Sequence, residues 1–275
     1  MKKIINISIL LFFVLSAFSL KAQTEALQRY WIDVDFNDTT LISSQVMSDK
    51  LVNFFYSFTD GDEQHFDSLS IAGLGVVLDK AKVNMRMYEY ILEFALNGYS
   101  SMGREQVTDY LLNYPKLAEG EISMEEGLRL DSITEPYQKV KVGAKAPDVY
   151  GITIDGLDYH LYDSKAERVI VVFWSTDCEY CHDLLVQFRK HLNLKTEFEL
   201  VTFALADSRE EVESTVKKMR LPGYHFYDDL RWESKPFLDY HVTSTPLALV
   251  LDAERNIVCK PYDWNDLKEW FKYNN

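Results

Sequence analysis

Two of the three cysteines in this 275-residue chain stand three positions apart, in the segment Asp177-Cys178-Glu179-Tyr180-Cys181. A continuous apolar run over residues 168–174 precedes them, as expected of a strand buried on both faces, and a helical pattern follows over 178–193. Cys178 then lies in the first turn of a helix, where free backbone N–H groups and the helix dipole favour a thiolate. Cys181 follows one turn later, close enough to attack a mixed disulfide formed at Cys178. The spacing therefore predicts thiol–disulfide exchange, with one accessible nucleophile and one resolving thiol.

Three other chemistries use similar residues. With His182, the segment also reads CxxCH, the attachment motif of c-type haem. A cytochrome domain is helical, however, and this motif follows a buried strand, so we disfavour haem. A single CxxC supplies two zinc ligands and no second pair completes the set. Residues 171–180 contain no Arg or Lys to activate a peroxide, which disfavours a peroxidase. We expect no metal and no other cofactor.

The elements around the cysteines alternate between strands and helices. Apolar runs over 168–174, 198–205, 247–251 and 256–260 predict strands, and an amphipathic helix is expected from Asp263. Ser208 with Glu211 three residues later forms a capping box, which predicts a helix start. This order predicts an α/β domain with helices on both faces of a mixed sheet. Cys259 falls in an expected strand and is interpreted as a small buried hydrophobic residue.

The segment from Phe173 to Cys181 resembles the active-site segment of the thioredoxin fold. The lead-in over 143–147 resembles the exported bacterial thioredoxin-like thiol–disulfide oxidoreductases related to the cytochrome-c-maturation (TlpA-like) reductases, and the likeness covers about residues 142–275. Thr243-Ser244-Thr245-Pro246 resembles the segment that holds this family's cis-proline. The resemblance implies that Thr245 and Pro246 bind a substrate strand laid across Cys178, with Trp174 beside the site.

The likeness departs at the proton acceptor for the resolving thiol. Many relatives carry a buried acid six residues before the first cysteine, where this chain has Val172. Others use a glutamate three residues after the second cysteine, where this chain has Leu184. Asp183 is the nearest candidate, although a charge in the first helical turn is more often a surface residue that stabilises the dipole. The residues expected to modulate the cysteines are Glu179, Tyr180, His182 and Asp183.

The charges next to the cysteines bear on the direction of the reaction. Asp177, Glu179 and Asp183 are acidic and oppose thiolate formation at Cys178. A less stabilised thiolate gives a more negative reduction potential, which favours a reductase, or a reducing isomerase, over an oxidase. We expect the substrates to be protein disulfides and the electron donor to be a membrane dithiol carrier. The alternative is a binding or assembly protein in which the CxxC is accessory.

The N-terminus predicts export. Two lysines after Met1 and an apolar run over residues 4–20 form a secretory signal peptide, with cleavage at Ala22. The expected protein lies in the periplasm without an integral membrane domain, although an uncleaved N-terminal anchor is the alternative. The formal net charge of −14 argues against nucleic acid as a partner.

Residues 24–137 follow a helical pattern and contain no cysteine, so we expect an all-α companion domain ahead of the α/β domain. The aromatic-rich stretch over 30–38 is similar to the start of helical domains that precede thioredoxin-like domains. Asn97-Gly98 is expected to end one of the helices. The expected organisation is a signal peptide over 1–22, a helical domain over 23–140 and a thioredoxin-like domain over 141–275.

Overall fold

The computed structural model describes residues 25–57, 63–117, 123–193 and 197–274. The predicted signal peptide over 1–22 lies outside the described residues. The chain divides into two compact units: a helical unit, which runs to Ala95 and includes Asp109–Leu130, and a sheet unit, which combines Leu96–Thr108 with Asp131–Asn275. The domain boundary at residue 140 stays a prediction.

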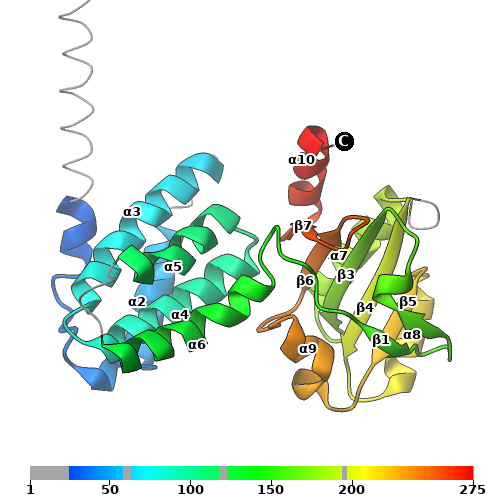
Figure 1. The fold of residues 1–275 in the computed structure, drawn as a ribbon, viewed down its shortest axis with the longest axis horizontal. Coiled ribbons are helices and arrows are strands. Elements are labelled where there is room, and N and C mark those ends of the chain that lie inside the picture. Colours follow the sequence, from blue (N-terminus) through cyan, green and yellow to red (C-terminus); the bar gives the residue numbers. More distant parts are fainter. Residues whose placement is uncertain (1–24, 58–62, 118–122, 194–196, 275) are drawn as a thin grey trace, which may run out of the picture. The chain divides into compact units, whose positions relative to one another are not determined.

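The N-terminal part of the chain is helical, as the sequence predicts (Figure 1). Its elements are the 3-10 helix η1 (Thr39–Leu41) and the helices α2 (Gln45–Tyr56), α3 (Glu63–Ala81), α4 (Met85–Ser101), α5 (Glu105–Leu117) and α6 (Met124–Lys139). Trp31 is buried in the core of the helical unit, with its ring centroid 4.9 Å from that of Phe54. Ser44 is the N-cap residue of α2, and its side chain accepts a hydrogen bond from the backbone N–H of Met47.

The expected helix end at Asn97-Gly98 is wrong, because α4 continues to Ser101. A glycine ends a helix by adopting a left-handed conformation just beyond it. In this chain Gly103, with φ of +64°, takes that conformation in the turn between α4 and α5. The glycine that follows the end of α4 is therefore Gly103 and not Gly98.

The sheet unit contains a five-stranded mixed sheet in the order β5-β4-β3-β6-β7. Its strands are β3 (Arg168–Ser175), β4 (Phe198–Leu205), β5 (Tyr224–Tyr227), β6 (Leu247–Leu251) and β7 (Ile257–Cys259). The first three run parallel, and β6 runs antiparallel to β3. This confirms the predicted α/β class with a mixed sheet. The sequence reading missed β5 and the antiparallel hairpin formed by β1 (Tyr150–Ile152) and β2 (Asp158–His160).

Apolar side chains cover both faces of the central strand β3, as the continuous apolar run predicts. One face packs with α7 (Glu179–His191), α8 (Arg209–Met219) and α10 (Trp264–Asn274), and it buries Trp174 completely. The other face packs with α9 (Lys235–Asp239) and the β1–β2 hairpin, and it buries Phe173. Because β3 is packed on both faces and paired with a strand on each edge, it fixes the position of the loop that follows it.

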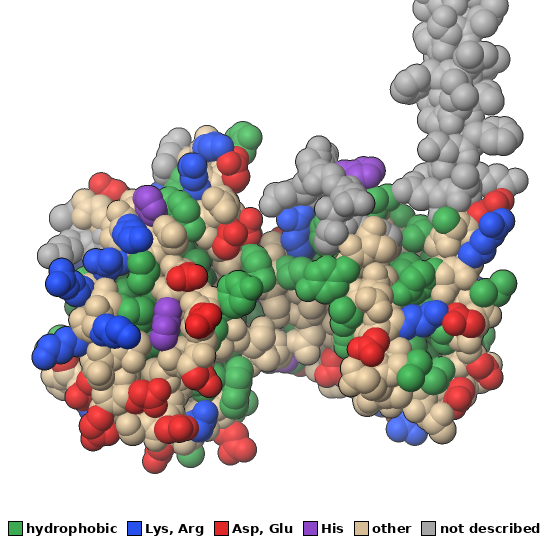
Figure 2. Space-filling view, turned by 180° about the vertical axis from the view of Figure 1, so that it is seen from behind, with side chains coloured by type: hydrophobic (Ala, Val, Ile, Leu, Met, Phe, Trp, Pro, Cys, Tyr) green, Lys and Arg blue, Asp and Glu red, His purple; other side chains and the backbone are tan. Residues whose placement is uncertain are grey.

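The surface carries both kinds of charge. On the face shown in Figure 2, acidic side chains gather at the lower end of the sheet unit and basic side chains gather toward its outer side. Within the described part of the chain, no helix is long and apolar enough to cross a membrane.

Candidate redox site

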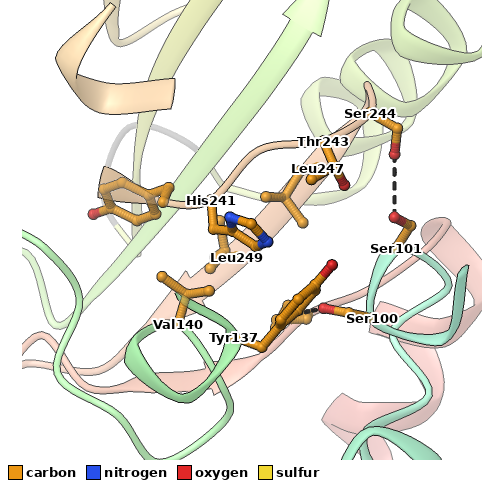
Figure 3. A pocket seen from close by; sticks show the side chains of 11 residues that line it. Ser100, Ser101, Tyr137, Val140, His241, Thr243, Ser244, Leu247 and Leu249 are labelled. Carbon is orange, nitrogen blue, oxygen red and sulfur yellow. Dashed lines mark hydrogen bonds between the residues drawn. The ribbon is translucent and has the colours of Figure 1, made fainter. Parts of the chain in front are cut away.

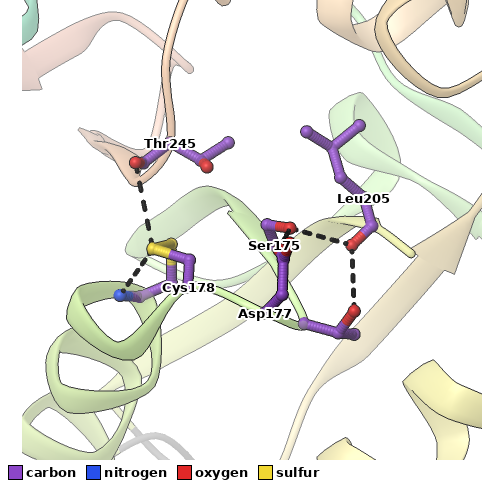
Figure 4. Close-up of a disulfide and its surroundings, with 7 residues drawn as sticks. Ser175, Asp177, Cys178, Leu205 and Thr245 are labelled. Carbon is purple, nitrogen blue, oxygen red and sulfur yellow. Dashed lines mark hydrogen bonds between the residues drawn. A yellow bond between two sulfur atoms is a disulfide. The ribbon is translucent and has the colours of Figure 1, made fainter. Parts of the chain in front are cut away.

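Cys178 and Cys181 form a disulfide where β3 ends and α7 begins (Figure 4). Their Cα atoms lie 5.2 Å apart. Cys178 is the N-cap residue of α7, and its Sγ accepts a hydrogen bond of 3.1 Å from the backbone N–H of Cys181. A helix N-terminus favours negative charge, so the same N–H would stabilise a Cys178 thiolate after reduction.

The two sulfur atoms differ in accessibility. Cys178 is half-buried, whereas Cys181 is completely buried in the apolar cluster that includes Trp174 and Leu185. An exposed sulfur can be reached by another molecule and a buried one cannot. This asymmetry fits Cys178 as the attacking thiol and Cys181 as the resolving thiol.

The segment before β6 approaches the disulfide from the other side. The Thr245–Pro246 peptide bond is cis, which confirms the conformation that the family resemblance implies. The carbonyl oxygen of Thr245 lies 3.9 Å from Cys178 Sγ, and both Thr245 and Pro246 are partly exposed. The substrate-binding role of these two residues stays a prediction.

Asp177, the acidic residue next to Cys178, is hydrogen-bonded within its own loop. The hydroxyl of Ser175 donates a hydrogen bond to Asp177 and lowers the pKa of that carboxyl, and Arg231 and His182 lower it further through their charge. Arg231, in the 3-10 helix η3 (Arg231–Glu233), also pairs with Asp207 at 2.8 Å. Sequence reasoning missed Arg231, because it lies far from the cysteines along the chain and no motif marks it.

The residues predicted to modulate the cysteines occupy different environments. Glu179, Tyr180 and Asp183 are exposed, and Tyr180 shows 80% of its surface to solvent. His182 is half-buried, with its ring 6.0 Å from that of Trp174 in an edge-to-face arrangement. Trp174 is fully buried, which fits a packing role beside the disulfide better than direct contact with a substrate.

A buried polar pair lies in the sheet next to the position where relatives carry an acid. Val172 is buried, and its neighbour across the parallel ladder is Thr202, which in turn neighbours His225. Thr202 Oγ1 and His225 Nδ1 are hydrogen-bonded at 2.8 Å. Burial lowers the pKa of His225, so its imidazole is neutral at pH 7. No motif or spacing in the sequence indicates this pair, because the two residues lie on different strands.

Side chains within the sheet unit support the loop that carries Thr245 and Pro246 (Figure 3). The hydroxyl groups of Ser244 and Ser101 lie 3.2 Å apart. Lys260 is buried, donates a hydrogen bond of 2.9 Å to Ser100 Oγ, and has its Nζ 3.6 Å from Glu105 Oε1. A cavity of about 10 Å³ lies among these residues, enough space for one water molecule.

The third cysteine, Cys259, is buried in β7 and has a free thiol, which confirms the prediction of a buried position. Burial raises the pKa of this thiol to about 12, and the charges of Asp266 and Glu105 add to the effect. A thiol that stays protonated and buried is a poor nucleophile.

Comparison with known proteins gives one family match and several structural matches. Residues 142–260 match the AhpC/TSA family. A thioredoxin-like protein from Bacteroides caccae is 16% identical, with 93% of this chain and 94% of that chain covered and a TM-score of 0.59. The thioredoxin domain of a thiol-disulfide oxidoreductase from Bacteroides vulgatus is 22% identical, covers 49% of this chain and 98% of its own, and gives a TM-score of 0.42. A search of curated proteins gives no match.

Proposed function

We propose that the protein is a thiol–disulfide oxidoreductase, on the premise that residues 142–260 have the thioredoxin-like fold and match the AhpC/TSA family. The observation that carries the proposal is the pairing of a half-buried Cys178 at a helix N-terminus with a buried Cys181 one turn later.

The proposed reaction begins from the reduced dithiol. The Cys178 thiolate attacks one sulfur of a substrate disulfide, a Cys178–substrate bond forms, and the other substrate sulfur leaves as a thiolate. Cys181 then loses its proton and attacks Cys178 Sγ, which expels the second substrate thiolate and forms the Cys178–Cys181 disulfide. Two electrons pass from the enzyme to the substrate, whose thiolates take up protons. An external dithiol restores the reduced enzyme.

We further propose that the reaction runs toward reduction of the substrate. The acids Asp177, Glu179 and Asp183 are exposed around Cys178 and oppose its thiolate, while the Cys181 N–H favours it. The balance gives a less stabilised reduced form than in strong oxidants. A reduction potential above about −150 mV, near the oxidising end of the range for this fold, would refute the direction.

The proposed setting is outside the cytoplasm. The support is the N-terminal sequence, which has the charge and apolar pattern of a signal peptide. In the oxidising periplasm a reductase needs a continuous supply of electrons, and a membrane dithiol carrier would provide them. The substrates would be exported proteins with accessible disulfides.

The test compares cysteine variants in the reduction of insulin disulfides. Cys178→Ser should abolish the activity, Cys181→Ala should accumulate mixed disulfides with substrate, and Cys259→Ala should retain the wild-type rate as the matched control. Captured partners of Cys181→Ala from the native compartment identify the substrates. If Cys178→Ser keeps the cellular phenotype and still binds partners, the chain is a binding or assembly protein. If hydrogen peroxide oxidises the reduced enzyme faster than disulfides do, the chain is a peroxidase.

A further inference from the structure

A second feature of the sheet unit lies at the same edge of the sheet as Cys178. The parallel strands β3, β4 and β5 end side by side, and Cys178 follows the end of β3. A cleft of about 640 Å³ opens beyond the ends of β4 and β5. Clefts of this size at the carboxyl ends of parallel strands are common binding sites in α/β proteins.

The cleft is continuous with the loop that leads to Cys178. The backbone N–H of Thr176, two residues before Cys178, donates a hydrogen bond of 3.0 Å to the carbonyl of Leu205 at the end of β4. Asp207 follows two residues later and lines the cleft. Arg231 pairs with Asp207 and also lies within electrostatic reach of Asp177. Asp207 and Arg231 therefore connect the lining of the cleft to the loop that carries Cys178.

The walls of the cleft are aromatic. Phe203, Phe226 and Phe237 are buried beneath it, and the rings of Phe203 and Phe226 are stacked at 4.9 Å. Tyr150, 65% exposed, is the aromatic side chain of the lining that solvent reaches most fully. Ile152, 61% exposed, extends the apolar surface along β1. Aromatic walls of this kind pack against alkyl chains and against the cationic groups of Arg and Lys.

The basic and acidic side chains at the rim of the cleft differ in whether they form ion pairs. Lys235 and Arg209 line the cleft, but Lys235 is paired with Asp239, and Arg209 with Glu213. Asp228 and Asp229 are exposed, and no ion pair found among the described residues involves Asp229.

The acidic character continues toward the disulfide. Asp177, Glu179 and Asp183 are exposed around Cys178. The surface from the disulfide to the cleft thus carries exposed negative charge, while Lys235 and Arg209 on the rim are paired with acidic side chains.

We propose that this cleft binds a basic segment of the polypeptide whose disulfide reacts at Cys178, with the alkyl stem of an Arg or Lys on the aromatic wall and its charge against Asp228 and Asp229. The inference rests on the proposed function and names its substrate class: disulfides that are flanked by cationic sequence. Long basic side chains suit the site because they present an apolar stem and a charged end together.

The test uses synthetic peptides that contain one intramolecular disulfide and differ only in the flanking run, which is arginine, serine or glutamate. The reduced full-length protein is mixed with each peptide, and tryptophan fluorescence follows its oxidation. At low salt the arginine peptide should react about tenfold faster than the serine peptide and the glutamate peptide slower, because charge complementarity raises association rates. The advantage should shrink as salt is added.

The variants assign the effect to the cleft. Asp229→Asn should lower the arginine advantage about threefold, and Tyr150→Ala should lower it at high salt as well, since the packing of the stem on this ring is lost. Glu254→Gln is the matched control: Glu254 is exposed in the β6–β7 turn, at the opposite edge of the sheet, and should leave the advantage unchanged. Equal effects of Asp229→Asn and Glu254→Gln would mean that net charge alone is responsible and would overturn the proposed site.

The serine peptide distinguishes a failure of the proposed oxidoreductase function from a failure of the proposed binding site in the cleft. If it does not oxidise the reduced protein at all, the proposed oxidoreductase function fails. If it reacts and the arginine peptide has no advantage, the function stands and the inference about the cleft is wrong.

Discussion

Replacing Glu105 by Gln should destabilise the sheet unit far more than replacing its partner Lys260 by Met. The reason is the difference in burial: the Lys260 side chain is 3% exposed and the Glu105 side chain is 24% exposed. Glu105→Gln leaves Lys260 buried, with Ser100 as its side-chain hydrogen-bond partner among the described residues. Lys260→Met leaves a partly exposed carboxylate that still accepts a hydrogen bond from the backbone N–H of Val142, and it places an apolar side chain in a buried position.

The magnitudes follow from these environments. Loss of one partner from a fully buried pair costs about 3 to 5 kcal/mol. Because Ser100 remains and a Gln side chain keeps a dipole at the site, Glu105→Gln should cost about 2 to 4 kcal/mol. Lys260→Met should cost about 1 kcal/mol, mainly the hydrogen bond to Ser100. The double variant should lie within about 1 kcal/mol of the wild type, because it contains no unpaired buried charge.

Urea unfolding at pH 7 measures these differences. Tryptophan fluorescence reports mainly the sheet unit, which holds four of the five tryptophans, Trp31 being the exception. Lys268→Met, an exposed lysine in α10, is the control for loss of a positive charge. Equal costs for the two single variants, or additive costs in the double variant, would refute the argument from burial.

Three further predictions concern single residues. Once the active-site disulfide is reduced, a thiol reagent at pH 8 should titrate the half-buried Cys178 in the native protein and the buried Cys259 only in denaturant, because burial keeps Cys259 protonated with a pKa of about 12. Gly223→Ala should destabilise by more than about 2 kcal/mol in urea unfolding, since Gly223 has φ of +111° and an added Cβ would lie 2.1 Å from the carbonyl oxygen of Leu200; Gly156→Ala, with φ of +82° and open space, should cost about 1 kcal/mol. Burial lowers the folded pKa of His225, so the unfolded state binds a proton below about pH 6.5 that the folded state does not. Stability should therefore fall below that pH by up to about 1.4 kcal/mol per unit, and His225→Phe should flatten this slope between pH 6.5 and 5.

Much of the architecture could be predicted because it depends on local patterns. The apolar run of β3, the cap at Ser208 and the turn before β7 are each set by a few adjacent residues, and the structure has them where the sequence indicates. The short strands β1, β2 and β5 were missed. They have three or four residues each, and partners elsewhere in the sheet or hairpin stabilise them more than their own sequence does.

The candidate site divides in the same way. The positions of Cys178 and Cys181 follow from one strand–helix junction and could be read from the sequence. Arg231 beside Asp177, and Thr202 beside Val172, depend on which strands are neighbours and on where a loop returns. Those relations are long-range, and no periodicity or motif in a single sequence encodes them.

The buried Lys260, which directly follows β7, also bears on where this chain can be truncated or fused to another protein. A fragment that starts at residue 141 contains all of the sheet and the cysteine pair, yet it lacks Ser100 and Glu105, which satisfy Lys260, and Ser101, which contacts Ser244. Such a fragment would lose both the partners of Lys260 and the turn that packs against its backbone. The thioredoxin-like sequence of this chain is therefore not a portable module: a chimaera that transplants it must bring the turn between α4 and α5 with it.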